Sequence, residues 1–182
     1  MKCIKMRGKK GLPHLDPDDP PRRRANQARG HGTWDTDRPP VPAVIGRESG
    51  QLRARVGQRC GAEELVDATV VPATKPGTTV YSDEWVGYKP LTRNGREHAT
   101  VNHQNGEYAR DDDGDGIREV HCNTLEGIWT GLRNFLRPFR GVNKVYLEQY
   151  VIIFQWGFNL KAVTDAFLRK LLGCSVITKS GT

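Results

Sequence analysis

Cysteine and long apolar runs are both scarce in this sequence. The four cysteines are far apart and include no Cys-x-x-Cys pair, which excludes a zinc ribbon. No apolar run approaches the roughly 20 residues that span a bilayer, and the basic start MKCIKMRGKKG lacks the apolar segment of a signal peptide. We therefore expect a soluble protein of a reducing, cytoplasmic compartment.

Carboxylates are scarce in the first third of the chain. Residues 1–60 hold 14 Lys and Arg against 6 Asp and Glu, whereas the remainder holds 14 against 15. A basic arm on a near-neutral domain favours a polyanionic partner, with nucleic acid ahead of an anionic membrane. A merely solvated basic tail is the alternative that composition leaves open.

Apolar periodicity is absent from residues 8–40, which are rich in Gly, Pro, Asp and Arg, so we expect residues 1–40 to form an extended basic arm. Two β-prone runs follow, Val41–Arg47 and Gln51–Val56, and the turn between them carries Gly50. They predict a β-hairpin. Further on, AEELVDATV favours a short helix. Two more strands are expected, over Thr78–Ser82 and His98–His103.

The period changes beyond residue 120. Apolar residues at positions 125, 128, 129, 132, 135, 136 and 139 share one helical face. Asn123 is the expected N-cap of this helix, with Glu126 completing a capping box, and Pro138 ends it. A second helix is expected over Lys144–Lys161, apolar nearly all round and therefore buried. Strands followed by helices predict one α/β domain over residues 41–172, with a flexible tail at 173–182.

The stretch RDDDGDGIREVHC resembles the start of an EF-hand calcium loop. Asp111, Asp113, Asp115 and Gly116 match its opening. The twelfth position needs a bidentate Glu, because calcium takes six to eight oxygen ligands, and that position is Cys122. We therefore interpret the stretch as a solvated acidic turn, with a calcium-binding module as a remote alternative.

Two carboxylates could converge on a magnesium ion. Asp83 follows a predicted strand, and Glu126 lies in the first turn of a predicted helix. Magnesium is held by one or two carboxylates together with phosphate oxygens, and paired ions can activate an attacking oxygen and stabilise a leaving one. From the residues alone, Glu126 capping its helix and Asp83 lying in a turn remain at least equally good interpretations.

Four stretches of the sequence carry a family resemblance. TTVYSDEWVGY, followed by HATVNHQNGEYARDDDGDGIREVHCNTLEGIWTGLRNFLRPFRGVNKVYLEQYVIIFQWGFNL, resembles the DDE-type transposases of bacterial insertion sequences, specifically the ISXO-like group. GLPHLDPDDPPRRRANQARGHGTWDTDRPP and GRESGQ resemble the same group. The resemblance implies an RNase H-like fold, like that of retroviral integrases, with a mixed sheet and helices. It also implies DNA as partner, both element ends and target, and a possible homo-oligomer, with no membrane.

The resemblance also implies roles for individual residues. In this family two Asp and one Glu bind two Mg²⁺ (or Mn²⁺) ions that drive strand cleavage and joining. Asp83 matches the second Asp and Glu126 the third acid, while His121 and Asn123 belong to the motif His-x-Asn-x-x-Glu. Arg133 matches the usual basic position on the same helical face and would contact a phosphate. The arm residues Arg22, Arg23, Arg24 and Arg29 would follow the DNA backbone.

The chain departs from the family pattern at its beginning. Relatives carry the first catalytic Asp on a strand just before the Gly-x-Lys-Gly that Gly8–Gly11 matches, but here that stretch is MKCIKMR and the first acid of the chain is Asp16. We therefore expect a transposase remnant, truncated or frameshifted, that lacks its first central strand and is inactive alone. The alternative from another class is a non-catalytic protein that binds DNA through the basic arm.

Overall fold

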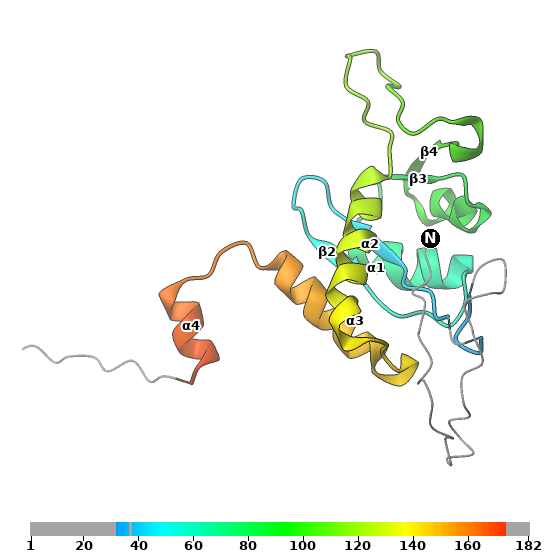
Figure 1. Cartoon of the computed structure of the whole chain (residues 1–182). Helices are drawn as coiled ribbons and strands as arrows, with labels where there is room; N and C mark the ends of the chain where they lie inside the picture. Colours follow the sequence, from blue (N-terminus) through cyan, green and yellow to red (C-terminus); the bar gives the residue numbers. More distant parts are fainter. Residues whose placement is uncertain (1–31, 37, 174–182) are drawn as a thin grey trace, which may run out of the picture.

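The structure, a computed structural model, describes residues 32–36 and 38–173, and combines small sheets with helices (Figure 1). In chain order the strands are β1 (Ala43–Ile45), β2 (Leu52–Ala54), β3 (Thr79–Asp83) and β4 (Glu97–Val101). The α-helices are α1 (Val71–Ala73), α2 (Asn123–Leu136), α3 (Lys144–Asn159) and α4 (Asp165–Leu171). A π-helix, Glu63–Val70, leads into α1, and three 3₁₀ segments cover Val86–Asn94, His103–Asn105 and Arg137–Phe139. The α/β class expected from the sequence is confirmed.

The strands form two separate two-stranded sheets. β1 and β2 pair antiparallel as the expected hairpin, with Val44 opposite Arg53. Gly50 has φ +60° in the connecting turn, a conformation that glycine adopts without a steric penalty. β3 and β4 pair in parallel, with Tyr81 opposite Ala99. Parallel strands require a crossover connection, and here the 3₁₀ segment Val86–Asn94 supplies it.

Side chains of α3 close the outer edge of β2. Asn159 accepts a hydrogen bond from the Leu52 N–H at 2.8 Å and donates one to the Leu52 carbonyl at 2.9 Å. Gln155 accepts a hydrogen bond from the Ala54 N–H, and Glu148 accepts one from the N–H of Val56, just after β2. A bare sheet edge exposes unpaired backbone groups that favour association with other strands. This edge of the described sheet is therefore protected by a helix.

Two clusters of buried side chains form the core. One joins the β1–β2 hairpin to α2 and α3 and contains Trp129, Leu132 and Leu147. The other joins the π-helix to β3 and the following 3₁₀ segment and contains Val66, Val80 and Leu91. Trp34, near the beginning of the described chain, packs against the first cluster. Trp85 packs against the second. Trp129 and Trp85 are thus packed against apolar neighbours, one in each cluster.

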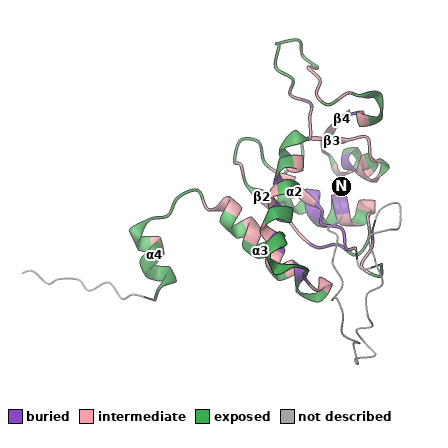
Figure 2. Cartoon of the chain, viewed as in Figure 1, coloured by how far each residue is buried: buried purple, intermediate pink, exposed green. Residues whose placement is uncertain are grey.

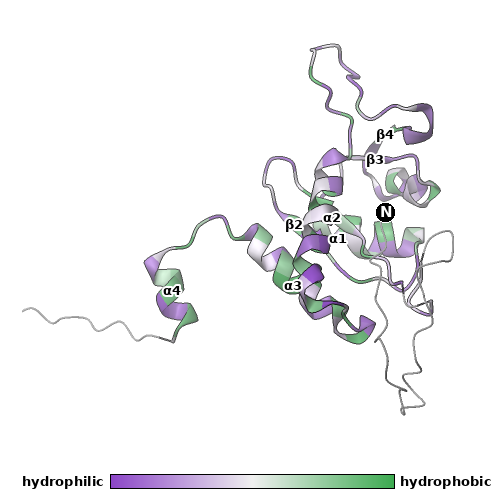
Figure 3. Ribbon diagram, in the orientation of Figure 1, coloured by the Kyte–Doolittle hydropathy of each residue, from purple (hydrophilic) through white to green (hydrophobic). Residues whose placement is uncertain are grey.

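Two expectations about the helices are wrong. The N-cap of α2 is Cys122, whose side chain makes no capping bond, and Asn123 is the first helical residue. α3 is not buried all round, because only Leu147 and Val151 are buried along it. Ile152, Ile153 and Trp156 are about half exposed. The apolar residues of α3 therefore exceed what the hairpin and α2 can cover. Helix α4 stands apart from the rest (Figure 1) and is largely exposed (Figure 2), although it carries hydrophobic residues (Figure 3).

Candidate metal and nucleic-acid site

Asp83 is the last residue of β3 and is half-buried. The strand places it there because Val80 and Ser82 alternate into the interior. The Asp83 carboxylate accepts a hydrogen bond from the Trp85 N–H at 3.3 Å, which orients the carboxylate at the point where the chain leaves the sheet. The expectation that Asp83 lies at the end of a strand is confirmed, and the strand has the expected five residues but begins and ends one residue later, at Thr79 and Asp83.

Glu126 lies in the first turn of α2 and lines the same cavity as Asp83. This cavity of about 300 Å³ lies where the two core clusters meet, and Tyr88, His103 and Cys122 also line it. The fold therefore brings together two carboxylates that are far apart in the sequence. The cavity is thus lined by carboxylates, the kind of oxygen ligand that hard divalent cations take.

The pKa of the Cys122 thiol is influenced by both carboxylates, which shows that both lie near it. Burial raises the pKa of Cys122, and the negative charges of Asp83 and Glu126 raise it further. Its sulfur lies 3.5 Å from His103 Nε2. A thiol held protonated is a poor metal ligand, because the thiolate is the ligating form. The carboxylate oxygens are therefore the hard donors of this cavity.

A half-buried tyrosine and a half-buried histidine lie within electrostatic reach of Asp83. Burial raises the pKa of Tyr88, and the charge of Asp83 adds to this shift. Burial lowers the pKa of His98, which Asp83 partly offsets, and His98 Nε2 lies 2.8 Å from the Ser82 hydroxyl. These shifts favour the neutral phenol and the neutral imidazole, so neither side chain adds a charge beside Asp83.

The other motif residues lie outside this cavity. His121 lines a separate cavity of about 760 Å³, and its pKa is lowered by burial and by Arg47. Asn123 and Arg133 are exposed. The Arg133 guanidinium donates to the Thr130 hydroxyl at 3.0 Å, and Arg133 lies two helical turns beyond Glu126, about 10 Å along the axis. The arm residues Arg22, Arg23, Arg24 and Arg29 lie outside the described part of the chain.

The acidic turn is a self-contained structure. Asp111 accepts bonds from the N–H groups of Gly114 and Gly116, and these bonds lower its pKa. Asp111, Asp113 and Asp115 lie close together, and Asp113 and Asp115 are exposed. Their oxygens serve the turn itself, as the interpretation of a solvated acidic turn expects.

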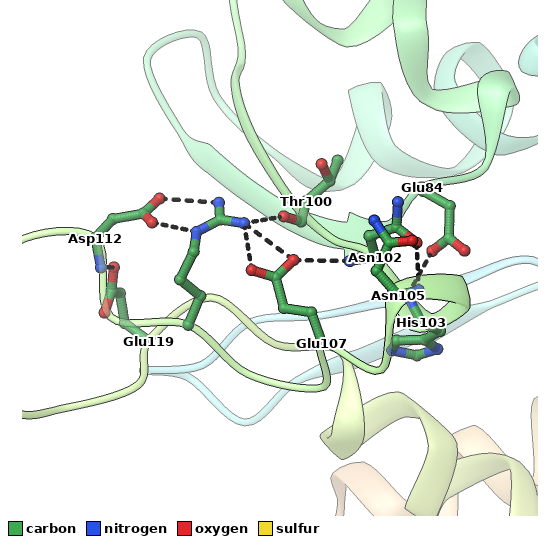
Figure 4. A network of polar contacts seen from close by, with 9 residues as sticks. Glu84, Thr100, Asn102, His103, Asn105, Glu107, Asp112 and Glu119 are labelled. Carbon is green, nitrogen blue, oxygen red and sulfur yellow. Dashed lines mark hydrogen bonds and ion pairs between the residues drawn. The ribbon is translucent and has the colours of Figure 1, made fainter.

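An arginine anchors this turn to β4 (Figure 4). Arg110 bonds to the Thr100 carbonyl at 2.9 Å and pairs with Glu107 and Asp112. The same region continues to Glu84, which accepts bonds from the N–H groups of His103 and Gln104. Glu84 is therefore engaged in holding the loop after β4, which leaves Asp83 as the member of the acidic pair that faces the cavity.

Comparison with known proteins identifies the family. Residues 15–159 match the model of the ISXO2-like transposase domain. The chain belongs to the ISXO2-like transposase family. It is also 33% identical over 150 residues to an uncharacterized protein in transposable element ISH50 of Halobacterium salinarum, an alignment that covers 81% of this chain and 48% of the relative.

The chain spans about half the length of the curated relative it matches, and no solved structure matches it. Since that relative is archaeal, the comparison does not support a specifically bacterial setting. Among the residues that the structure describes, no helix is long and apolar enough to cross a membrane.

Proposed function

We propose that Asp83 and Glu126 are two of the three carboxylates of a DNA strand-transfer site. The observation that carries the proposal is their convergence on one cavity, from the end of β3 and the first turn of α2. Membership of a transposase family supports it. The same family membership supports an RNase H-like arrangement of the sheet and a DNA partner.

The two carboxylates would hold Mg²⁺ or Mn²⁺ through hard oxygen ligands, leaving the remaining positions to water and phosphate oxygens. A bound ion of this kind supplies charge neutralisation at the phosphate and activation of the attacking oxygen. Tyr88 and the Cys122 thiol, both held protonated, add no negative charge to the site. Arg133 and the exposed Asn123 would contact DNA beside the cavity, and His121 would support the loop that enters α2.

Among the residues that the structure describes, the cavity offers one carboxylate fewer than the three that the family resemblance implies. Residues 1–15 contain no Asp or Glu, and the described cavity is lined by Asp83 and Glu126 as its only acids. Two ions cannot both be held at the spacing that in-line displacement requires when one of three carboxylates is missing. The proposed activity of this chain alone is therefore DNA binding without cleavage.

Cleavage of DNA carrying the parent element's ends tests the proposal. The chain of residues 1–182 should be inactive, whereas a version with an acidic strand placed before Gly8 should show Mg²⁺- or Mn²⁺-dependent cleavage. Asp83→Asn and Glu126→Gln in that version should abolish cleavage, while the matched change Asp113→Asn in the acidic turn should not. Activity that survives Glu126→Gln would remove Glu126 from the site.

A second candidate function is DNA binding through the basic arm without any metal chemistry. The charge of residues 1–60 favours it. The two functions separate in the restored version, because an arm-only binder stays inactive after the acidic strand is added.

A further inference from the structure

Helix α2 has a polar side that faces away from the core. Five exposed residues on or just after the helix share the side opposite its buried positions. We call this side the outer face of α2, and its residues are Gly127, Thr130, Arg133, Asn134 and Arg137. Glu126, which lines the cavity of the proposed metal site, lies beside the beginning of this face. The outer face therefore leads away from that cavity along the helix axis.

The outer face and the turn that follows it carry charge of one sign. Residues 127–147 contain four Lys and Arg and no Asp or Glu. Three of these cations, Arg133, Arg137 and Arg140, are exposed. Within residues 32–36 and 38–173, no ion pair joins any of the three to a carboxylate. Several exposed guanidinium groups along one side of a helix attract a polyanion.

Two glycines interrupt α2, and their surroundings differ. A glycine inside a helix destabilises the helix relative to alanine. A Cβ at Gly131 would contact the Phe154 ring at 3.4 Å, so Gly131 lies at the packed interface with α3. A Cβ at Gly127 would meet no atom of the described chain within 4 Å. Gly127 therefore leaves the helix backbone open on the outer face, which suits a partner that approaches the backbone closely.

Hydrogen bonds hold the middle of the outer face close to the helix. The Thr130 hydroxyl donates to the Glu126 carbonyl at 3.2 Å, and the Arg133 guanidinium donates to the Thr130 hydroxyl at 3.0 Å. Arg133 is thus drawn about one turn toward the cavity. From Glu126 to Arg137 the helix rises about 16 Å. A B-form strand has a phosphate every 3.4 Å along its axis, so a strand lying along α2 would pass about five phosphates over that length.

The side chains of the outer face suit a phosphate backbone better than unpaired bases. They are guanidinium, hydroxyl and amide groups, all of which donate hydrogen bonds to phosphate oxygens. None of the five residues is aromatic, so the face has no ring on which an unpaired base could stack. The exposed side of α3 differs, because it carries the apolar residues Ile152, Ile153 and Trp156. Of these two helices, α2 is the one whose surface fits a nucleic-acid backbone.

We propose that the outer face of α2 binds the sugar–phosphate backbone of duplex DNA, with Gly127 at the closest approach and Arg137 and Arg140 as the phosphate contacts farthest from the cavity. These contacts fix the position of the duplex and do not read its sequence. That the bound strand leads into the cavity rests on the proposed function, which places the reacting phosphate there. The binding itself needs neither a metal ion nor cleavage.

Fluorescence anisotropy of a labelled DNA duplex of arbitrary sequence, titrated with the full chain in EDTA, tests the proposal. The background carries Arg22–Arg24 as alanine, which removes their contribution to affinity. Gly127→Gln should weaken binding by at least about fivefold, the equivalent of one net hydrogen bond. Its urea midpoint should be unchanged or higher, because glutamine is a better helix former than glycine.

Two matched controls accompany these variants. Gly157 is an exposed glycine of α3, and a Cβ there would also meet nothing within 4 Å in the described chain, so Gly157→Gln should leave DNA affinity unchanged. Arg137→Gln combined with Arg140→Gln should reduce the log–log salt slope by up to about two, one for each lost phosphate contact. Arg169→Gln, which removes an exposed charge of α4, should leave the slope unchanged.

Weaker binding by Gly127→Gln at an undiminished urea midpoint supports the proposal. Equal affinities of Gly127→Gln and Gly157→Gln, or no measurable DNA binding in this background, would overturn it. If Gly127→Gln lowers the urea midpoint, the two arginines decide, because a reduced salt slope supports the proposal and an unchanged slope overturns it. EDTA removes divalent ions, so these results do not depend on the metal site. Failure of the proposed function is recognised separately, by cleavage that survives Glu126→Gln.

Discussion

The protection of the β2 edge by α3 makes a quantitative prediction about stability. In Asn159→Ala, the Leu52 N–H and C=O both lose their partners at 2.8 and 2.9 Å. Leu52 is 0% exposed, so water does not replace those partners without rearrangement. Each unsatisfied backbone group costs about 1–3 kcal/mol. Because Asn159 is the last residue of α3 and the helix end can open slightly, we expect a loss of about 2–4 kcal/mol.

Two further variants calibrate this number. Gln155→Ala removes one acceptor, that of the Ala54 N–H, and should cost about half as much. Gln149→Ala changes an exposed glutamine of the same helix and should lie within about 0.5 kcal/mol of the parent. Urea unfolding followed by circular dichroism measures all three, with unchanged m-values showing that stability alone has changed. If Asn159→Ala and Gln149→Ala have the same midpoint, the edge bonds do not stabilise the fold and the reasoning is wrong.

Three other predictions follow from the charges. DNA affinity should fall steeply with salt, and replacing Arg22–Arg24 by alanine should reduce the log–log salt slope by up to about three; an unchanged slope would move the DNA contact off the arm. A peptide of residues 110–129 should bind calcium no tighter than millimolar in calorimetry, since Cys122 stands where a bidentate Glu is required, and a micromolar constant would reverse this. With the other cysteines replaced by serine, Asp83→Asn should lower the pKa of Cys122, because the carboxylate charge raises it. Alkylation of Cys122 at constant pH should then be faster. An unchanged alkylation rate would show that Asp83 does not act on the Cys122 thiol.

Local patterns in the sequence were sufficient to predict the strands and the two elements that carry Asp83 and Glu126. The hairpin, the strand that ends in Asp83 and the amphipathic α2 each follow from short-range signals: β-prone runs around Gly50 and a 3.6-residue apolar period. Those same signals fix where Asp83 and Glu126 lie on their own elements. The position of a residue within its own strand or helix depends on its sequence neighbours, so a sequence pattern can predict it.

Long-range contacts were beyond such patterns. The interpretation of α3 as fully buried was wrong because its apolar residues outnumber the partners that the hairpin and α2 provide, so Trp156 remains half exposed. Nothing in the sequence indicates that Asn159 and Gln155 would cap β2, since polar residues near a helix end usually face water. The N-cap assignment to Asn123 failed by one position, the usual uncertainty of a helix boundary.

The expectation that the first central strand is missing rests on the resemblance alone and stays a prediction. Within the described residues, the hairpin and the β3–β4 pair form two separate two-stranded sheets. Sequence reasoning did not anticipate the contacts between them, which are Val44 packed against the second core cluster and Arg47 over the Tyr81 ring.

Binding of Mn²⁺ to the full chain, counted by electron paramagnetic resonance, tests the central claim most directly. The background should carry Asp111, Asp113 and Asp115 as asparagine, which keeps the turn's acceptor oxygens and removes its charge. We predict weak Mn²⁺ binding in that background, lost in Asp83→Asn and in Glu126→Gln alike. Binding that is unchanged by both substitutions would contradict the assignment of these two carboxylates to a common metal site.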